Sequence, residues 1–408
     1  MFLEQIFRLF AGLLLGSWVA RYLGPDQFGV LSYALAFTAI LSSVAKLGLD
    51  SLIVQKLVVL PEKAPLFLGT AFWLKLTGAF FSIFCLLVLL PVIPTEQDTK
   101  LFILIISSGL LFQSFEVIDF FFQSQALSKF ISLCKLIQLL ISSIIKIYLI
   151  YTKSPLINFV IVSTIDQITL AATYCFVYKQ KNHPGFFSVF DSKIGFELLQ
   201  NSWPLMLSSL VALVYMRIDQ IMIDYFLGDR ATGIYSATVK VCEVWYFVPV
   251  ILNAALFPAI INAKRLDSKI YQLRLERFMR LLIFLSFCCA FLTTVFGREI
   301  ILMLFGPSYL DSLPALKVHS WAGIFVSLGV GSSGWFINEG LQRFAFYRTG
   351  LGALINIFLN FFTIPRWGLV GAASATLITQ AFSTFLFDAF SSQTRGLFLI
   401  KLRSFLSK

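Results

Sequence analysis

The chain of 408 residues is 58% hydrophobic and 13% charged, and 45 of its residues are phenylalanine. Soluble globular proteins are about 45–50% apolar and about 25% charged, so this composition excludes a soluble enzyme, a disordered chain and a disulfide-stapled secreted domain. In so apolar a chain, a net charge of +11 indicates lysines and arginines collected in cytoplasmic loops, and not nucleic-acid binding.

Twelve apolar runs follow one another along the sequence. A helix needs about 20 apolar residues to cross a ~30 Å hydrocarbon layer, and the runs have that length. They do not alternate every second residue, as the strands of a membrane barrel do. The sequence therefore predicts an all-α integral membrane protein with twelve transmembrane helices. The runs cover residues 2–20, 29–49, 66–90, 101–123, 130–151, 156–178, 202–227, 233–258, 278–304, 316–338, 343–363 and 368–390.

The basic residues predict how the chain is oriented. With the N-terminus in the cytoplasm, 20 of the 32 lysines and arginines lie on the cytoplasmic side, 7 lie on the outer side, and 5 lie within spans. This asymmetry favours cytoplasmic N- and C-termini. The run 2–20 is expected to span the membrane and not to be a cleaved signal, because no basic residue precedes it and no A-x-A site follows it.

A short motif occurs twice, half a chain apart. Leu23, Gly24, Gly29 and Ser32 recur as Leu227, Gly228, Gly233 and Ser236 at an offset of 204 residues. Six predicted helices separate the copies, so both halves start on the same side of the membrane, as in transporters built from parallel repeats. We expect two parallel-related six-helix lobes around a central cavity. The expected boundaries are lobe 1–178, cytoplasmic basic linker 179–201, lobe 202–390 and basic cytoplasmic tail 391–408.

Cysteine and histidine give no sign of a metal site, a cofactor or catalysis. The six cysteines lie in apolar runs without CxxC spacing, so they are expected to be small buried hydrophobic residues. The two histidines, His183 and His319, have no ligand neighbours at useful spacing. There is no Ser-His-Asp, zinc or P-loop signal. The chain is therefore predicted not to be an enzyme and to need neither metal nor cofactor.

Several segments together resemble a known family, in the right order along almost the whole chain. They are Arg21–Gly29, Arg217–Met222, Gly233–Ala237, Lys240–Glu243, Leu304–Tyr309 and Gly368–Thr376. These segments resemble polysaccharide-biosynthesis flippases of the Wzx type, the O-antigen translocases of the multidrug/oligosaccharidyl-lipid/polysaccharide (MOP) exporter superfamily. The resemblance implies a MATE-like fold. It also implies translocation of undecaprenyl-diphosphate-linked oligosaccharide units from the cytoplasmic to the periplasmic leaflet, together with other polysaccharide assembly proteins.

Three basic residues within the spans are candidates for holding an anionic diphosphate. An ionised side chain at the bilayer centre costs roughly 2.5–3.5 kcal/mol, so it usually faces a cavity or a partner. The candidates are Arg217 and Lys75, which lie too deep for easy snorkelling, and Lys240. Arginine suits bidentate phosphate contacts, whereas lysine acts as a point charge. Lys146 and Lys46 lie nearer helix ends and are expected to snorkel or to mark a boundary.

Five acidic residues within the spans are candidates for cavity acids or ion coupling. They are Asp219, Glu116, Asp119, Asp166 and Glu243. Glu116 and Asp119 share a helix face, so they either raise each other's pKa and bind a proton or pair with Lys75, Lys146 or Arg217. Glu243 shares a face with Lys240 and either neutralises it or serves the cavity. Asp219 lies on a different face from Arg217.

Polar residues in the spans and two rival functions complete the expectations. Glycan contacts are expected from amide and phenol groups at Gln113, Gln123, Asn253, Asn356, Asn360, Tyr215 and Tyr235. One rival is a multidrug exporter of the same superfamily, although cavity cations would repel its organic-cation cargo. The other is a membrane-embedded polysaccharide polymerase, for which the short outer loops leave little room.

Overall fold

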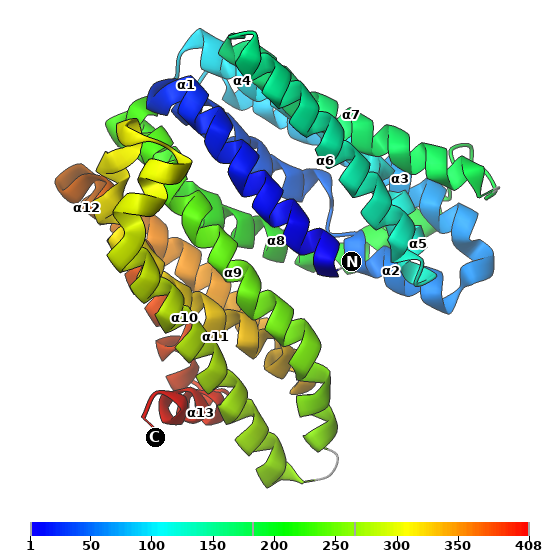
Figure 1. Cartoon of the computed structure of the whole chain (residues 1–408). Coiled ribbons are helices and arrows are strands. Elements are labelled where there is room, and N and C mark those ends of the chain that lie inside the picture. Colours follow the sequence, from blue (N-terminus) through cyan, green and yellow to red (C-terminus); the bar gives the residue numbers. More distant parts are fainter. Residues whose placement is uncertain (1, 182, 265–266, 407–408) are drawn as a thin grey trace. The chain divides into compact units, whose positions relative to one another are not determined.

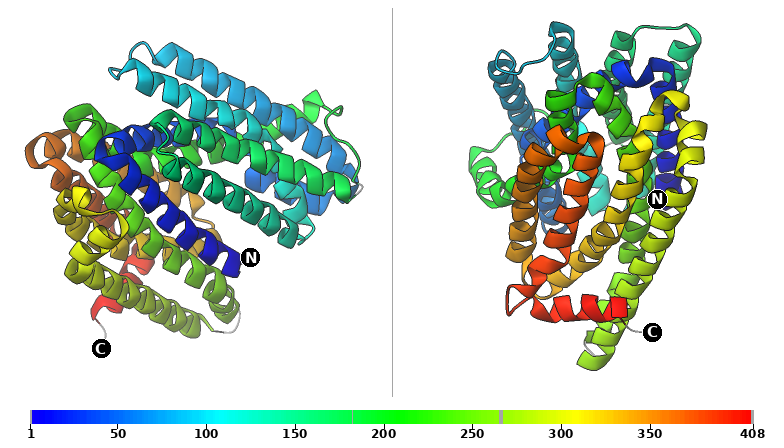
Figure 2. Two further views of the ribbon diagram at one scale, coloured as in Figure 1. Left: turned by 45° about the horizontal axis from the view of Figure 1, so that its top comes forward. Right: turned by 90° about the vertical axis from the view of Figure 1, so that its left-hand side faces the viewer.

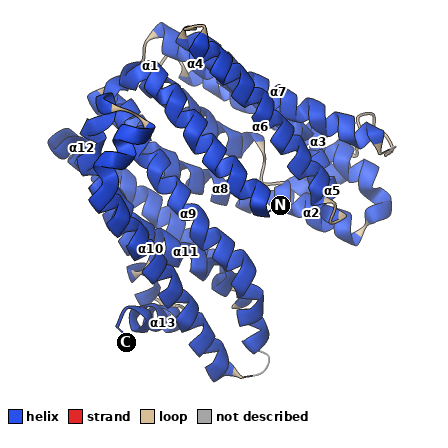
Figure 3. Cartoon of the chain, in the orientation of Figure 1, coloured by secondary structure: helices blue, strands red, loops and turns tan. Residues whose placement is uncertain are grey.

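The computed structural model describes residues 2–181, 183–264 and 267–406. Within these ranges every regular element is a helix, as Figure 3 shows. Met1, Asn182, Arg265 and Lys408 enter the predicted orientation or domain boundaries and lie outside the described residues. The prediction of an all-α chain is confirmed for the residues that the structure describes.

The helices follow one another with short connections (Figure 1). Four of them are short 3₁₀-helices, labelled η. The elements are α1 (Phe2–Ala45), α2 (Asp50–Val59), η1 (Pro61–Lys63), α3 (Ala64–Leu89), α4 (Gln97–Ser108), η2 (Gly109–Glu116), α5 (Val117–Ser124), α6 (Ser128–Tyr151), α7 (Leu156–Gln180), α8 (Ser192–Leu227), α9 (Asp229–Lys264), α10 (Ser268–Leu304), η3 (Pro307–Ser312), α11 (Leu313–Asn338), α12 (Gln342–Thr384), η4 (Leu386–Ala389) and α13 (Arg395–Leu406).

Ten helical stretches are long and apolar enough to cross a membrane in the described part of the chain. Two of them, Phe7–Val59 and Gln342–Ala389, have 53 and 48 residues. Each contains a glycine whose backbone is not helical, Gly24 with a φ of 72° and Gly368 with a φ of 56°. Each of these long stretches has room for two spans, one before and one after its glycine. The ten stretches are therefore consistent with twelve spans.

The chain divides into two compact units. Unit 1 consists of Met1–Leu23 and Val30–Arg217, and unit 2 consists of Gly24–Gly29 and Ile218–Lys408. The turn Gly24–Gly29 therefore interrupts unit 1 in the sequence but packs within unit 2. The two six-helix lobes joined by a linker at 179–201, expected from the sequence, stay a prediction.

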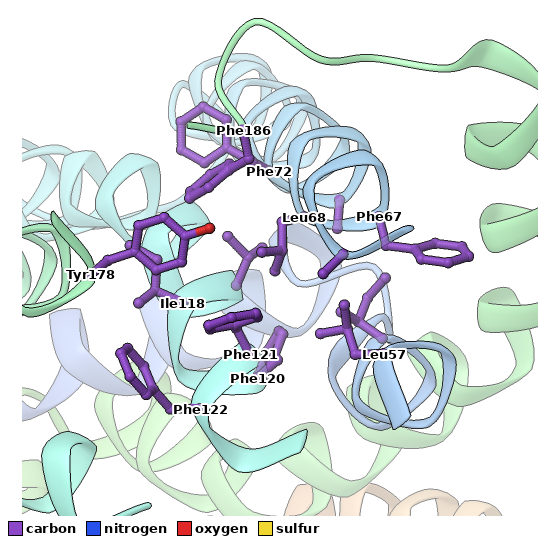
Figure 4. Packing of buried hydrophobic residues seen from close by; sticks show 14 of the residues in the cluster. Leu57, Phe67, Leu68, Phe72, Ile118, Phe120, Phe121, Phe122, Tyr178 and Phe186 are labelled. Atoms are coloured by element: carbon purple, nitrogen blue, oxygen red, sulfur yellow. The ribbon is translucent and has the colours of Figure 1, made fainter. Parts of the chain in front are cut away.

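Unit 1 is held together by an aromatic core (Figure 4). Phe120, Phe121 and Phe122 on α5 pack with α2, α3 and α7 side chains such as Leu57 and Tyr178. Phe186, in the connection after α7, belongs to the same core. Between membrane helices such side chains contribute through close van der Waals packing. This core fixes η2 and α5, which carry two of the acidic candidate residues.

Unit 2 contains α9, α10, α11 and α12, which lie side by side (Figure 1). The two copies of the repeated motif contact each other within this unit. A Cβ on Gly29 would overlap the carbonyl group of Asp229, and a Cβ on Gly233 would overlap the carbonyl oxygen of Pro25. Only glycine lets the two backbones approach so closely. The repeat seen in the sequence is therefore also a packing contact.

The last helix, α13, runs across the ends of its neighbours in unit 2, as both views in Figure 2 show. Lys401 and Asp388 anchor it with an ion pair of 2.6 Å, and both side chains are 0% exposed. Lys401 also donates to the carbonyl oxygen of Thr384 at 2.7 Å. Burial lowers the pKa of Lys401 to about 8 although Asp388 opposes the shift. At neutral pH Lys401 therefore stays largely protonated, and its contacts with Asp388 and Thr384 fix α13.

Candidate functional site

Two glycine turns bring four polar residues to one level of unit 2. Asp219 lies nine residues before Gly228 and Tyr235 lies seven residues after it. Asn360 and Thr376 lie eight residues before and eight after Gly368. Gly228 has a φ of 82°, which favours glycine and reverses the chain between α8 and α9. Residues at similar distances from such a turn lie at similar depths, because each helix rises 1.5 Å per residue.

Asp219 accepts hydrogen bonds from three neutral donors. Thr376 Oγ1 lies 2.5 Å from Oδ2, and the phenol of Tyr235 donates to the same oxygen at 3.2 Å. Asn360 Nδ2 donates to Oδ1 at 2.6 Å. The carboxylate is 6% exposed. Hydrogen bonds from neutral groups offset only part of the free-energy cost of burying a charged carboxylate, and binding a proton removes the rest of that cost.

Two further side chains extend this cluster. The hydroxyl oxygen of Tyr235 lies 3.2 Å from Nδ1 of His319. Asn360 also donates to Oδ1 of Asn356 at 3.0 Å. Asn356 and Asn360 are both 0% exposed. We call Asp219, Tyr235, His319, Asn356, Asn360 and Thr376 the Asp219 cluster. It is a buried polar network on four helices, and such networks favour one arrangement when their members are satisfied.

A second polar network, in unit 1, consists of alternating charges. Lys75 Nζ lies 3.0 Å from Glu116 Oε2 and 3.2 Å from Asp50 Oδ1. Lys46 pairs with the other oxygen of Glu116 at 3.2 Å. Lys75 is 1% exposed, and its ammonium group also lies 4.7 Å from the centre of the Phe120 ring. Two lysines and two acids balance, so this chain of charges is neutral as a whole.

The other two acidic candidates of unit 1 also have lysine partners. Asp119 pairs with Lys135 at 2.9 Å and accepts from Gln123 Nε2 at 2.7 Å. Asp166 pairs with Lys146 at 3.2 Å. Of the alternatives left open by the sequence, the pairing of these acids with lysines is the one found. The specific partners differ in part, because Lys46 and Lys135 take part and the sequence pattern did not suggest them.

The remaining candidate residues lie in different surroundings. Arg217 is half-buried at the end of unit 1 on α8. Lys240, on α9 of unit 2, is half-buried, and its Nζ lies 4.7 Å from the centre of the Phe28 ring. Phe28 belongs to the first copy of the repeated motif. Glu243 is half-buried one turn further along α9. A cation over an aromatic face gains about 0.5–2 kcal/mol.

Sequence reasoning missed some members of these networks. His319 carried no ligand signal because its partner Tyr235 is 84 residues away in the sequence. Thr376 was noted only as the last residue of the segment Gly368–Thr376. The ion pair between Lys401 and Asp388 was missed because both residues lie near the predicted tail. The described residues contain no group of three or more His, Cys, Asp or Glu side chains that could hold a metal ion.

The sequence is similar to proteins of polysaccharide biosynthesis. The family described as "Polysaccharide biosynthesis protein" matches residues 18–314. A Capsular polysaccharide biosynthesis protein CapF from Staphylococcus aureus is 24% identical over 388 residues, which cover 93% of this chain and 94% of that protein.

Two solved structures have the same fold. "Lipid II flippase MurJ, inward closed conformation" has a TM-score of 0.75 at 16% identity and is matched over 99% of this chain and 90% of that one. An inward-facing multidrug resistance MATE family transporter of the MOP superfamily has a TM-score of 0.73 at 13% identity, over 98% and 96% of the two chains. The prediction of a MATE-like fold is confirmed. The two structures are described as those of a flippase and a transporter.

Proposed function

Because the chain belongs to the polysaccharide biosynthesis protein family, we propose that it is a flippase for polyprenyl-diphosphate-linked oligosaccharides. The cargo moves from the cytoplasmic to the periplasmic leaflet of a bacterial inner membrane, for surface polysaccharide assembly. Such a cargo has an anionic diphosphate, a polar glycan and a long hydrocarbon tail. Its glycan needs a polar path, while its tail stays in lipid.

The names of similar proteins support this cargo class. CapF is named for capsular polysaccharide biosynthesis, and the MurJ structure is described as that of a lipid II flippase. A lipid-linked saccharide is the chemistry that the two descriptions have in common. Undecaprenyl as the tail and O-antigen as the product are the finer parts of the proposal.

The buried carboxylate of Asp219 is the observation that carries the proposal. A passive scaffold gains nothing from placing an acid that is 6% exposed on a membrane helix, because buried ionisable groups in membranes are costly. A transporter gains a group that changes its charge between conformations. We assign to Asp219 the coupling of cargo movement to an ion gradient, with Glu243 as a further acid on α9.

Arg217 is the residue that we propose for the cargo's diphosphate. It is half-buried in a span, and its guanidinium suits bidentate phosphate binding. Lys240 is a second candidate, to be tested separately. Lys75 is a weaker candidate because Asp50 and Glu116 already compensate its charge. We therefore give Lys75, Glu116, Asp119 and Asp166 the structural task of neutralising each other's charges in unit 1.

Flipping of a labelled lipid in vesicles tests the function. The full-length protein is reconstituted with a fluorescent polyprenyl-diphosphate oligosaccharide, and a membrane-impermeant quencher reports the leaflet in which the label lies. We expect the wild type to move the label and Asp219→Asn to be slower by about tenfold, a typical coupling magnitude. Asp98→Asn, at an exposed carboxylate, is the matched control and keeps the wild-type rate.

The same vesicles separate the rival functions. Efflux of an organic cation, with no movement of the labelled lipid, would establish the multidrug exporter instead. Extension of the glycan in the presence of unlabelled donor would indicate a polymerase. Either result contradicts the flippase proposal.

A further inference from the structure

Three titratable side chains form a hydrogen-bonded line in unit 2. Tyr235 lies 3.2 Å from Asp219 Oδ2, and its oxygen also lies 3.2 Å from Nδ1 of His319. Asp219, Tyr235 and His319 are 6%, 0% and 5% exposed. When Tyr235 donates to Asp219, its oxygen accepts from Nδ1–H of His319, because a hydroxyl has one proton and two lone pairs. A proton that enters or leaves Asp219 therefore has a path through two neighbouring groups.

A pocket continues along the helix faces that carry this line. It encloses a cavity of about 20 Å³ and lies between α9, α10 and α11. Cys242 and Gly323 line it, and they follow Tyr235 by seven and His319 by four residues. Residues four or seven apart share a helix face. The pocket thus begins one to two helical turns from the Tyr235–His319 pair.

The pocket has the room and the polar groups that ordered water requires. Hydroxyl groups of Ser286, Thr293, Ser320 and Ser327 line it. A cavity measured in this way needs about 10–15 Å³ to hold one water molecule, and that water needs 2–4 polar partners. Trp245, also on the lining, is 36% exposed. Water is therefore the occupant that the lining fits best.

We propose that Asp219 exchanges its proton with water in this pocket through Tyr235 and His319. The inference rests on the proposed function and specifies the coupling ion as a proton. The pocket is then the aqueous entry of a proton path, and Tyr235 and His319 are its two relay groups. Neither Tyr235 nor His319 was among the residues that the sequence predicted to couple transport to an ion.

The transfer balances at every atom. A hydronium ion in the pocket delivers a proton to Nε2 of His319 and becomes water, while Nδ1–H passes its proton to the oxygen of Tyr235. The O–H bond of Tyr235 breaks as its proton joins the carboxylate of Asp219. The two ring nitrogens have then exchanged roles, and a turn of the ring or the reverse hop restores the starting tautomer. No oxidant, reductant or other reactant is needed.

Groups from four helices surround the line. From α8 comes Asp219, and from α12 come the neutral donors Asn360 and Thr376. From α9 come Tyr235, Tyr246 and the acid Glu243, which follows the pocket residue Cys242. From α10 come the hydroxyls of Ser286 and Thr293. The pH response of cargo flipping therefore reports on Asp219 and His319 together with Glu243.

The test follows flipping driven by a pH gradient in reconstituted vesicles. The full-length protein and the labelled lipid are used, in H₂O and in D₂O, at several pH values. The wild type is expected to respond to the gradient and to slow in D₂O. In Tyr235→Phe, which keeps the ring but lacks the hydroxyl, and in His319→Gln, the rate falls by about tenfold and the D₂O effect is lost. If these side chains only position Asp219, the rate falls but the D₂O effect and pH profile stay those of the wild type.

A third variant tests the pocket apart from the relay groups. Gly323→Leu fills the pocket, whereas Ser333→Leu adds the same side chain at an exposed site of the same helix. Only the first is expected to slow gradient-driven flipping. Equal rates in the two variants, or a wild type that follows a sodium gradient and ignores pH, would overturn the relay. A wild type that moves no label at all would instead overturn the proposed function, so the two failures differ.

Discussion

Arg230 Nη1 donates to Oδ2 of Asp26 at 3.2 Å across 204 residues of sequence. The two residues occupy the same position in the two copies of the repeated motif, because the repeat offset is also 204 residues. The contacts of Gly29 with Asp229 and of Gly233 with Pro25 are reciprocal in the same way. The two turns therefore meet about a local two-fold axis, as the surfaces of a symmetric dimer do.

The glycines of this contact are predicted to be irreplaceable. Gly29→Ala or Gly233→Ala places a Cβ on the opposite backbone carbonyl, and overpacking of this kind costs about 1–3 kcal/mol. The expected result is a lower melting temperature of the detergent-solubilised protein. Gly12→Ala is the control, since a Cβ there meets no atom within 4 Å. Equal melting temperatures for all three variants would contradict the contact.

Arg217→Ala is predicted to abolish flipping while the protein still inserts and folds. Arg217→Lys should keep part of the activity, because the charge remains but the bidentate geometry does not. The measurement is the labelled-lipid assay, with size-exclusion chromatography as the check on folding.

The competing explanation for Arg217 is that it balances a buried acid. Glu116, Asp119 and Asp166 each have a lysine partner, so neutralising one of them should not restore flipping to Arg217→Ala. Recovery in any such double variant would show that the arginine compensated a carboxylate and did not bind the diphosphate.

The ion pair that holds α13 is predicted to be important for stability. Lys401→Met leaves Asp388 as a charge without its partner at a fully buried position, which costs about 3–5 kcal/mol. Thermal unfolding in detergent measures the loss, and Arg403→Met, at an exposed position of the same helix, should be near neutral. The double change Lys401→Met with Asp388→Leu is expected to recover most of the stability. A double variant as unstable as the single one would count against the pair.

The topology has a direct test by reporter fusion. Alkaline phosphatase fused after Asp98 is expected to be active, because that loop is predicted to lie outside. Fusion after Lys264 is expected to be inactive, because the basic residues around it favour the cytoplasm. A green fluorescent protein at the same two sites should give the opposite pattern. Activity of the phosphatase after Lys264 would reverse the predicted orientation.

The membrane helices were predictable because hydropathy acts locally. Each span needs only its own apolar residues, and the breaks at Gly24 and Gly368 coincide with glycine and a nearby proline in the sequence. Contacts between residues on different helices were harder to predict. Asn356, Asn360 and Tyr235 were expected to hold a glycan, yet they belong with Asp219, up to 141 residues away. Such pairings follow from the packing of helices, which one sequence does not reveal.

The ion pairs of unit 1 were also difficult to predict from the sequence. The spacing of Glu116 and Asp119 suggested two acids acting together. In the structure Glu116 ends η2 and pairs with Lys75 and Lys46, whereas Asp119 on α5 pairs with Lys135. The partners come from different helices, Lys75 from α3 and Lys135 from α6. The spacing of the two acids along the sequence does not show which lysines the fold brings near each of them.

The turn Gly24–Gly29 has a consequence for biosynthesis. The ribosome finishes it 204 residues before its symmetry-related turn, and at about 5–20 residues per second this interval lasts about 10–40 s. During this interval the nascent chain contains Asp26 but not yet Arg230. The part of unit 2 that Asp26 contacts has not yet been synthesised. The first turn can therefore form its contacts in unit 2 only after the second turn has been synthesised.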